Sequence, residues 1–273
     1  MTGSWGRPIA AALVLLALLP GAAAAKEKVK RERTRLALPI VVETAGDAPD
    51  RVHSFRTGQL WGTQPARYRS AVTVEAPVTV PEKGEIGVIL PGTRLVELQA
   101  TSKAFTGSLY CRTLAMGRKQ RPALVCLADR DGDGAMDQLW AGAAASLEAV
   151  VPFPDIRSLT PIEPVRYRPV TDPASLALQI GFYVSGKNPL LGQHHFYAAL
   201  GVDGTLAYVL HESHKAVTMA DLPKSVSLGG GEIRVKGYAQ GTYQAEVTRP
   251  LPAGERLVVS PYPTQTIFVY VPG

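Results

Sequence analysis

The sequence predicts an all-β protein, either a β-sandwich or two small β units made of short antiparallel strands. Apolar residues alternate with other residues in three segments, 72–80, 232–236 and 267–271, which is the period of a half-buried strand. Turn-forming Gly, Pro and Asp residues cluster between such segments, at 91–92, 203–204, 229–231 and 252–254. Helical periodicity is almost absent, and the one helical candidate is the alanine-rich segment 141–151. Many short strands at close spacing favour a sandwich or barrel over alternating βαβ units.

The first 25 residues predict a secretory signal peptide. Arg7 supplies positive charge, residues 9–19 form an eleven-residue apolar run, and four alanines precede Lys26, which is the pattern that a signal peptidase accepts. An uncleaved membrane anchor is disfavoured, because a helix needs about 20 apolar residues to span a bilayer. We therefore expect the mature chain, residues 26–273, to be exported to the periplasm or outside the cell, with no transmembrane segment.

The basic character of the chain is concentrated near its start. The formal net charge is +6, yet residues 26–35 carry six basic and two acidic side chains, and Arg7 belongs to the signal segment. Only about one positive charge is left for the rest of the chain, so we expect a basic flexible tail and no basic binding face. Such a tail is either simply solvated or contacts anionic envelope polymers. A nucleic-acid partner is disfavoured, because no basic and aromatic pattern recurs along the chain.

Six prolines between residues 152 and 173 suggest a boundary. Proline cannot donate to a sheet ladder, so this stretch is predicted to be an edge or a connector. We expect an N-terminal β unit at 36–151 and a C-terminal β unit at 174–273. A long crossover within one sandwich is the alternative.

The mature chain contains two cysteines, Cys111 and Cys126. In an oxidising compartment two such cysteines usually pair. If residues 117–120 form a hairpin loop, the two cysteines fall directly opposite each other on one face, where Cβ atoms come within bonding range. A structural disulfide is therefore predicted, and the C-x-x-C spacing of redox-active pairs is absent.

Directly after this hairpin comes the acidic run Asp129-Arg130-Asp131-Gly132-Asp133-Gly134-Ala135-Met136-Asp137. Carboxylates at alternate positions can converge on one hard cation, and Gly134 permits a sharp bend. An EF-hand is disfavoured, because its twelfth position is Trp140 and helical flanks are lacking. The alternative is a polar Asp-Gly turn that needs no metal.

The D-x-D-x-D-G-x-x-D run resembles the calcium-binding β-hairpin loop of integrin-α and FG-GAP repeats. The resemblance covers nine residues in a single copy, so the fold and adhesive function of those families do not carry over. It implies a strand at 123–128, another at 138–141, and Ca²⁺ between them. The implied ligands are the side chains of Asp129, Asp131, Asp133 and Asp137 and the backbone carbonyl of Ala135.

Four of the five histidines lie in residues 194–214. A two- or four-residue turn around 203–204 would pair the flanking segments as a hairpin. His194 and His211 would then share one face, and His195, Glu212 and His214 the other, which is the nearer approach to a zinc site. The alternative is that these histidines are ordinary strand or rim residues.

Taken together, these features predict an exported, non-catalytic cell-envelope β protein with a structural calcium loop. Its partner would be an envelope component or a glycan. Two alternatives are an envelope metal-dependent hydrolase that uses the histidine hairpin, and a glycan- or peptide-binding module with an exposed aromatic patch at Tyr197 or Tyr208. We identify no catalytic or cofactor-binding residues from motifs.

Overall fold

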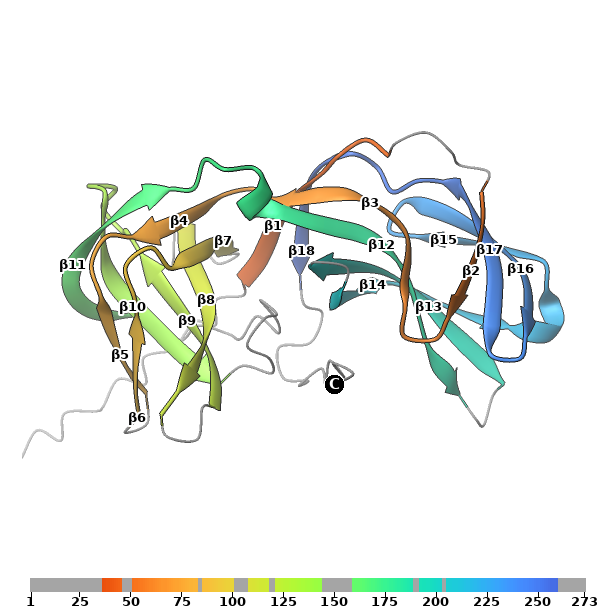
Figure 1. Ribbon diagram of the computed structural model, residues 1–273, viewed down its shortest axis with the longest axis horizontal. Helices are drawn as coiled ribbons and strands as arrows, with labels where there is room; N and C mark the ends of the chain where they lie inside the picture. The colour runs from red at the N-terminus through yellow and green to blue at the C-terminus, as the bar shows by residue number, and fades with distance from the viewer. Residues whose placement is uncertain are drawn as a thin grey trace, which may run out of the picture. The chain divides into compact units, whose positions relative to one another are not determined.

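The computed structural model describes residues 36–45, 51–82, 85–100, 108–117, 121–143, 159–188, 192–202 and 205–259. These residues form eighteen β-strands, two short 3-10 turns and no α-helix (Figure 1). The all-β prediction is therefore confirmed. The predicted signal peptide, the basic tail, the turn at 203–204 and the strand at 267–271 lie outside the described residues.

Twelve strands form one sheet, and six of them close into a barrel. The closure arises because β7 pairs with both β4 and β8, so that the pairings β7–β4–β11–β10–β9–β8 return to their start. Figure 1 shows β8, β9, β10 and β11 side by side in this barrel. The barrel strands are β4 (Ala71–Val74), β7 (Arg94–Ala100), β8 (Ser108–Met116), β9 (Arg121–Ala128), β10 (Ala135–Ala143) and β11 (Thr160–Pro169).

Apolar side chains from all six barrel strands meet in one buried cluster. Its members include Val72, Leu95, Val125, Met136 and Val165. A separate two-stranded sheet, β5 (Val78–Glu82) and β6 (Glu85–Ile89), adds further side chains to the same cluster. Because these residues share one face of every strand, they fill the barrel interior, as is usual for small closed barrels.

The alternating segment 72–80 forms two strands, where the pattern predicts one. The four valines of the segment are buried as the alternation indicates, but residues 75–77 are exposed and separate β4 from β5. Pro77 has no N–H to donate, so the ladder cannot continue through it. The chain therefore leaves the large sheet here and starts the small one.

The proline-rich segment contains a strand. Residues 160–169 form β11, whose first part pairs with β10 and whose last three residues pair with β4. Pro164 falls in the irregular stretch of pairing opposite Asp137, and Pro169 ends the strand. Segments on both sides of 152–173 contribute strands to the twelve-stranded sheet, and residues 32–273 belong to one compact unit. The division into two β units stays a prediction.

The helical interpretation of 141–151 is wrong at its start. Residues 141–143 extend β10 and pair with residues 123–125 of β9. The backbone groups of these residues find hydrogen-bond partners in β9, and this sheet pairing overrides the helix propensity of alanine. The remainder of that segment lies outside the described residues.

The other strands build a second core. Six belong to the large sheet: β1 (Leu36–Val42), β3 (Leu60–Tyr68), β12 (Ala177–Asn188), β13 (Gln193–Val202), β14 (Thr205–Thr218) and β18 (Gly254–Val259). The 3-10 turns η1 (Ala174–Leu176) and η2 (Met219–Asp221) precede β12 and follow β14.

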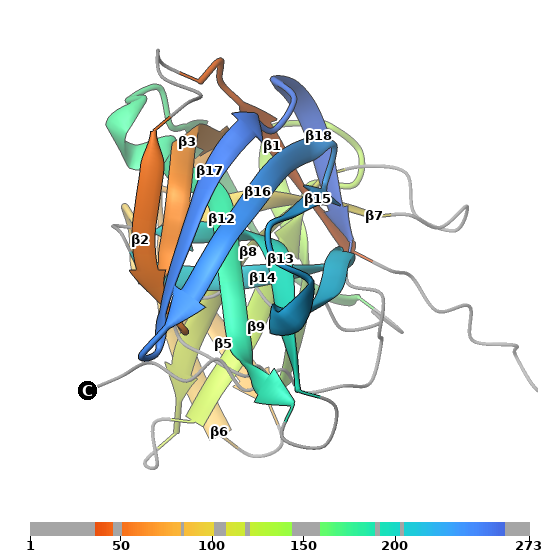
Figure 2. The ribbon, with the colours of Figure 1, turned by 90° about the vertical axis from the view of Figure 1, so that its right-hand side faces the viewer.

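A four-stranded sheet completes this core. Its strands, side by side in Figure 2, are β15 (Lys224–Leu228), β16 (Gly231–Ala239), β17 (Thr242–Arg249) and β2 (Val52–Arg56). The predicted alternation at 232–236 is confirmed, because Ile233 and Val235 are fully buried within β16. The two sheets share one apolar cluster, in which Phe55 of β2 stacks on Trp61 of β3 with ring centroids 4.0 Å apart.

Candidate metal centre

The acidic loop begins next to the disulfide. Cys111 of β8 and Cys126 of β9 are directly paired in the ladder and covalently linked, so the predicted hairpin register and the disulfide are both confirmed. A disulfide that closes a loop of this length stabilises a protein by about 3 kcal/mol in the chain-entropy model. β9 ends two residues later at Ala128, and the acidic loop therefore starts from a strand that is held firmly in place.

The loop connects two adjacent strands, as the resemblance implies. Ala128 pairs with Gln138, and the pairing of β9 with β10 continues from there away from the loop. Within the loop, Asp129, Asp131 and Asp133 each offer a carboxylate oxygen, and these oxygens all lie within 4.8 Å of one another. Three carboxylates at that separation can hold a metal ion.

Backbone N–H groups of the loop orient these carboxylates. Asp129 accepts hydrogen bonds from the backbone N–H of Gly132 at 2.7 Å and of Gly134 at 3.0 Å. Asp131 accepts one from the N–H of Asp133 at 3.3 Å, and Asp133 one from the N–H of Ala135 at 2.8 Å. Gly132 and Gly134 have φ of +78° and +88°, values that side chains with a Cβ rarely adopt. The loop therefore has a defined shape of its own, with its carboxylates turned inward.

A tyrosine from another strand contacts the loop. The Tyr167 hydroxyl of β11 donates a hydrogen bond to Asp129 Oδ2 at 3.0 Å. Burial, together with the negative charge of Asp129, raises the pKa of Tyr167 to about 12, so the phenol keeps its proton. Burial acts to raise the pKa of Asp129, but the hydrogen bonds from Gly134, Gly132 and Tyr167 outweigh it and lower that pKa below its usual value.

Sequence reasoning missed Tyr167. It lies 38 residues from Asp129 and no motif connects the two, because their contact depends on β11 pairing beside β10. Tyr167 also contacts the ring of Tyr110, with centroids 5.9 Å apart, and both rings pack against the cluster that fills the barrel. The loop is thus tied to the barrel interior.

Asp137, the fourth predicted side-chain ligand, is placed differently from the other three. It is not part of the cluster of three aspartates, and it lies at the irregularity in the pairing of β10 with β11. Its Oδ1 atom is buried and has no hydrogen-bond partner, which is costly for a carboxylate. Ala135, whose carbonyl was the fifth predicted ligand, begins β10 opposite Arg166.

Trp140 does not lie at the loop. It pairs with Cys126 in the ladder, its ring extends over Gly142, and it packs against the second core. β10 runs through the position where an EF-hand would begin its second helix. The geometry of the acidic segment therefore agrees with a loop between two strands and not with an EF-hand.

The histidine hairpin separates into a buried histidine and an accessible pair. His194 is 2 % exposed, and its Nδ1 hydrogen bonds with the Tyr243 hydroxyl, so it is a core residue. His195 of β13 and His214 of β14 come together, with Nδ1 of His195 2.8 Å from Nε2 of His214. The side chains of His211 and Glu212 lie outside the described part of the structure.

Two irregularities change the strand partners of the histidines. The pairing near the turn, Val202 with Thr205, matches a two-residue loop, but residues 211–213 have no partners in β13. Residue 207 is also unpaired, so beyond both irregularities the register is shifted by four in total, and His214 pairs with Tyr197 and His195 with Ala216. An even shift changes the partners and keeps each residue on its face, and His195 and His214 therefore still share one face.

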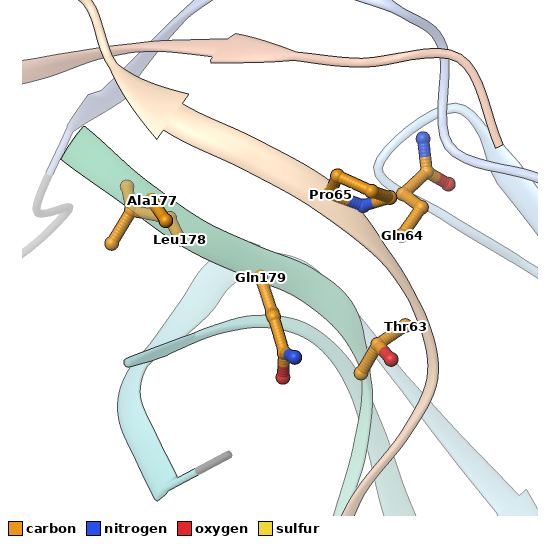
Figure 3. Close-up of a pocket in the computed structure, with 6 residues that line it drawn as sticks. All are labelled: Thr63, Gln64, Pro65, Ala177, Leu178 and Gln179. Carbon is orange, nitrogen blue, oxygen red and sulfur yellow. The ribbon is translucent and has the colours of Figure 1, made fainter. Parts of the chain in front are cut away.

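The groove of Figure 3 lies along β3 and β12. It has a volume of about 360 Å³ and is lined by Thr63, Gln64, Pro65, Ala177, Leu178 and Gln179. Thr63 and Gln179 point to one side of the two strands, and Gln64 points away from them. Gln64 is buried and holds its amide against the backbone of Glu43 and Leu251. The lining therefore offers a hydroxyl and an amide, which can form hydrogen bonds but cannot perform acid–base chemistry.

Comparisons with protein-family models, curated proteins and solved structures find no match to this chain. The likeness of the acidic loop to FG-GAP loops therefore rests on its own nine residues and their geometry. Within the described ranges, no helix has the length and apolar character needed to cross a membrane.

Proposed function

We propose that this chain is an exported, non-catalytic protein of the cell envelope in which the loop at 129–137 binds Ca²⁺. The observation that carries the proposal is the convergence of three carboxylates within 4.8 Å in a hairpin loop whose shape is set by its own backbone. Carboxylate and carbonyl oxygens are the ligands that Ca²⁺ prefers, and weak, millimolar-range sites are common in extracellular modules.

The role of the ion would be to hold three barrel strands together. The loop joins β9 to β10, and Tyr167 brings β11 to Asp129. An ion between the carboxylates removes their mutual repulsion, and so favours the arrangement in which the three strands meet. The buried and unpaired Oδ1 of Asp137 supports the proposal, because a cation nearby would compensate its charge.

Export is supported by the disulfide, since disulfides persist in oxidising compartments, and by the predicted signal peptide. Among the described residues, the acidic loop is the one place where three potential metal ligands of the His, Cys, Asp and Glu types converge. For that reason we favour a structural ion over the hydrolase alternative. The envelope component or glycan that the protein would contact stays a prediction.

Calorimetric melting tests the proposal. Calcium at about 100 times its dissociation constant should raise the free energy of unfolding by about 2.7 kcal/mol, because a ligand that binds only the folded state stabilises it by mass action. Asp131→Asn should abolish most of this effect, since it removes a charged ligand whose carboxylate accepts a hydrogen bond from Asp133 of the same loop. Tyr167→Phe should retain the site with an affinity weakened about tenfold, the lower end of what is expected for a lost hydrogen bond to a charged group.

Asp221→Asn is the matched control, because Asp221 is an exposed aspartate with a single ion pair to Lys224. It should keep the full response to calcium. If neither calcium nor chelator changes the melting temperature of the wild-type protein, the loop is only a turn that binds no calcium.

A further inference from the structure

The outer face of β13 and β14 carries two imidazoles in direct contact. Nδ1 of His195 and Nε2 of His214 are 2.8 Å apart, and the two rings are nearly parallel, with centroids separated by 5.0 Å. His214 is exposed and His195 is half-buried. Ions in solution can therefore reach the pair.

Strand pairing and a neighbouring ring restrict the positions of the two imidazoles. His214 lies opposite Tyr197 in the ladder, and the Tyr197 ring stacks against His214 at a centroid distance of 5.1 Å. His195 is two residues before Tyr197 on the same strand, so the two histidines form a diagonal pair on one face. Both histidines lie on paired strand residues, His195 opposite Ala216 and His214 opposite Tyr197, and strands orient ligands better than loops do.

The surroundings favour the neutral form of His214. Burial, followed by electrostatic interactions with His195 and Lys215, lowers the pKa of His214. A neutral imidazole has a lone pair available for a metal. Among the side chains that the structure describes, the groups that act on it are the other imidazole, Lys215 and the Tyr197 ring.

The spacing of the two nitrogens indicates a particular coordination geometry. Ring nitrogens bind divalent transition metals at about 2.0 Å, so two ligands at right angles lie about 2.8 Å apart, and two tetrahedral ligands about 3.3 Å apart. The observed 2.8 Å is the length of the hydrogen bond between the two rings, so the two nitrogens can take adjacent positions of a square-planar or tetragonal ion without moving further apart. Cu²⁺ adopts this geometry and binds nitrogen ligands more tightly than other divalent metals of its row.

We propose that His195 and His214 form a copper(II) site in which Nδ1 of His195 and Nε2 of His214 take two adjacent equatorial positions. Water occupies the remaining positions on the exposed face. The proton that the two rings share in the absence of metal moves to the outer nitrogen of its own ring, so two neutral imidazoles bind without net proton release. The site shares no residue and no strand with the calcium loop, and it goes beyond the function proposed above.

Titration of the full-length purified protein with Cu²⁺, followed by calorimetry and electron paramagnetic resonance, tests the site. We expect one Cu²⁺ per chain, with an axial spectrum that shows coupling to two nitrogens. His195→Gln and His214→Gln should each weaken binding at least tenfold and remove one nitrogen coupling. His53→Gln is the matched control, because His53 is a single half-buried histidine whose ring lies 5.8 Å from Trp61, and it should bind copper as the wild type does.

A measurement on the wild-type protein guards against variants that fail to fold. Substoichiometric Cu²⁺ should broaden the NMR signals of His195, Tyr197 and His214 before others. Copper binding should also be unchanged in Asp131→Asn and in excess Ca²⁺, so a failure of the calcium proposal is distinguishable from a failure of this one. The inference is overturned if both histidine variants bind Cu²⁺ like the wild type, if broadening centres elsewhere, or if no copper binds.

Discussion

Glu97 shows how one charge is tolerated in the interior of this fold. Its carboxylate accepts hydrogen bonds from Arg69 Nε at 3.0 Å and from the Ser108 hydroxyl at 2.8 Å, and the residue is 5 % exposed. Burial acts to raise the pKa of Glu97, but the bonds from Arg69 and Ser108 more than offset it, so that the pKa is lowered. Arg69, whose side chain is 31 % exposed, has its other side open to solvent.

The direction of this shift predicts an acid-sensitive contribution to stability. A carboxyl whose pKa is lower in the folded state stabilises the protein above its unfolded value of 4.5, and the contribution is lost as the pH falls through the folded value. Glu97→Gln should therefore reduce the free energy of unfolding at pH 7 by about 2 kcal/mol, less than for a fully buried pair because solvent screens Arg69. The deficit should shrink as the pH falls below 4.5.

Urea unfolding of both proteins between pH 3 and pH 7 measures this difference. Glu246→Gln is a suitable control, since Glu246 pairs with Lys236 at 2.5 Å and both side chains are more exposed than those of Glu97 and Arg69. A deficit for Glu97→Gln that stays constant across the whole pH range would contradict the assignment.

Among the elements, β3 and β12 meet at an irregular point. Their register shifts between Ile180 and Phe182, and Gly181 lies at that shift. A Cβ at Gly181 would come within 2.7 Å of the Trp61 carbonyl oxygen and 3.2 Å of Thr63 Cα. Both are backbone atoms that cannot move aside without distorting β3, so glycine is required here for packing.

Gly181→Ala should therefore reduce the free energy of unfolding by about 2–3 kcal/mol, the usual cost of overpacking. Gly186→Ala, on the same strand, is the control: nothing lies within 4 Å of a Cβ at that position, and we expect a change within about 0.5 kcal/mol. Chemical unfolding of the two variants side by side tests this. If the two substitutions change the free energy of unfolding equally, β3 and β12 shift relative to each other at little cost to accommodate the methyl group at residue 181.

At the scale of the whole molecule, strand environments differ sharply. Residues 123–128 of β9 are all buried, and β9 has a paired neighbour on each side, β8 and β10. β15 lies at the edge of the four-stranded sheet with β16 as its one partner, and three of its five residues are exposed. Local opening therefore costs much less at β15 than at β9.

Hydrogen exchange should follow this difference. We expect the amides of β9 to be among the slowest to exchange, near the global unfolding limit, and those of β15 to exchange orders of magnitude faster through local opening. Mass spectrometry of peptides from the two strands measures both rates. Equal protection of β15 and β9 would show that the two sheets open only together.

The sequence by itself determined the features that depend on near neighbours. Alternation at 232–236 predicted which side chains of β16 are buried, and hairpin geometry predicted that Cys111 faces Cys126. The spacing of Asp129, Asp131 and Asp133 likewise predicted converging carboxylates, and the resemblance to FG-GAP loops implied their position between two strands. These inferences succeed because side chains two residues apart share a face of a strand, and because a short loop fixes the register of its hairpin.

Only the tertiary structure decided the features that depend on distant partners. Closure of the barrel requires β7 to pair with β8 as well as β4, and Tyr167 reaches Asp129 because β11 lies beside β10. The residues that lie opposite His195 and His214 likewise follow from register shifts in β14 that no local pattern indicates. Strands far apart in the chain pair in the arrangement that buries the apolar face of each sheet and gives most backbone N–H and C=O groups a hydrogen-bond partner. This arrangement depends on all the strands together, so no short segment of the sequence specifies it.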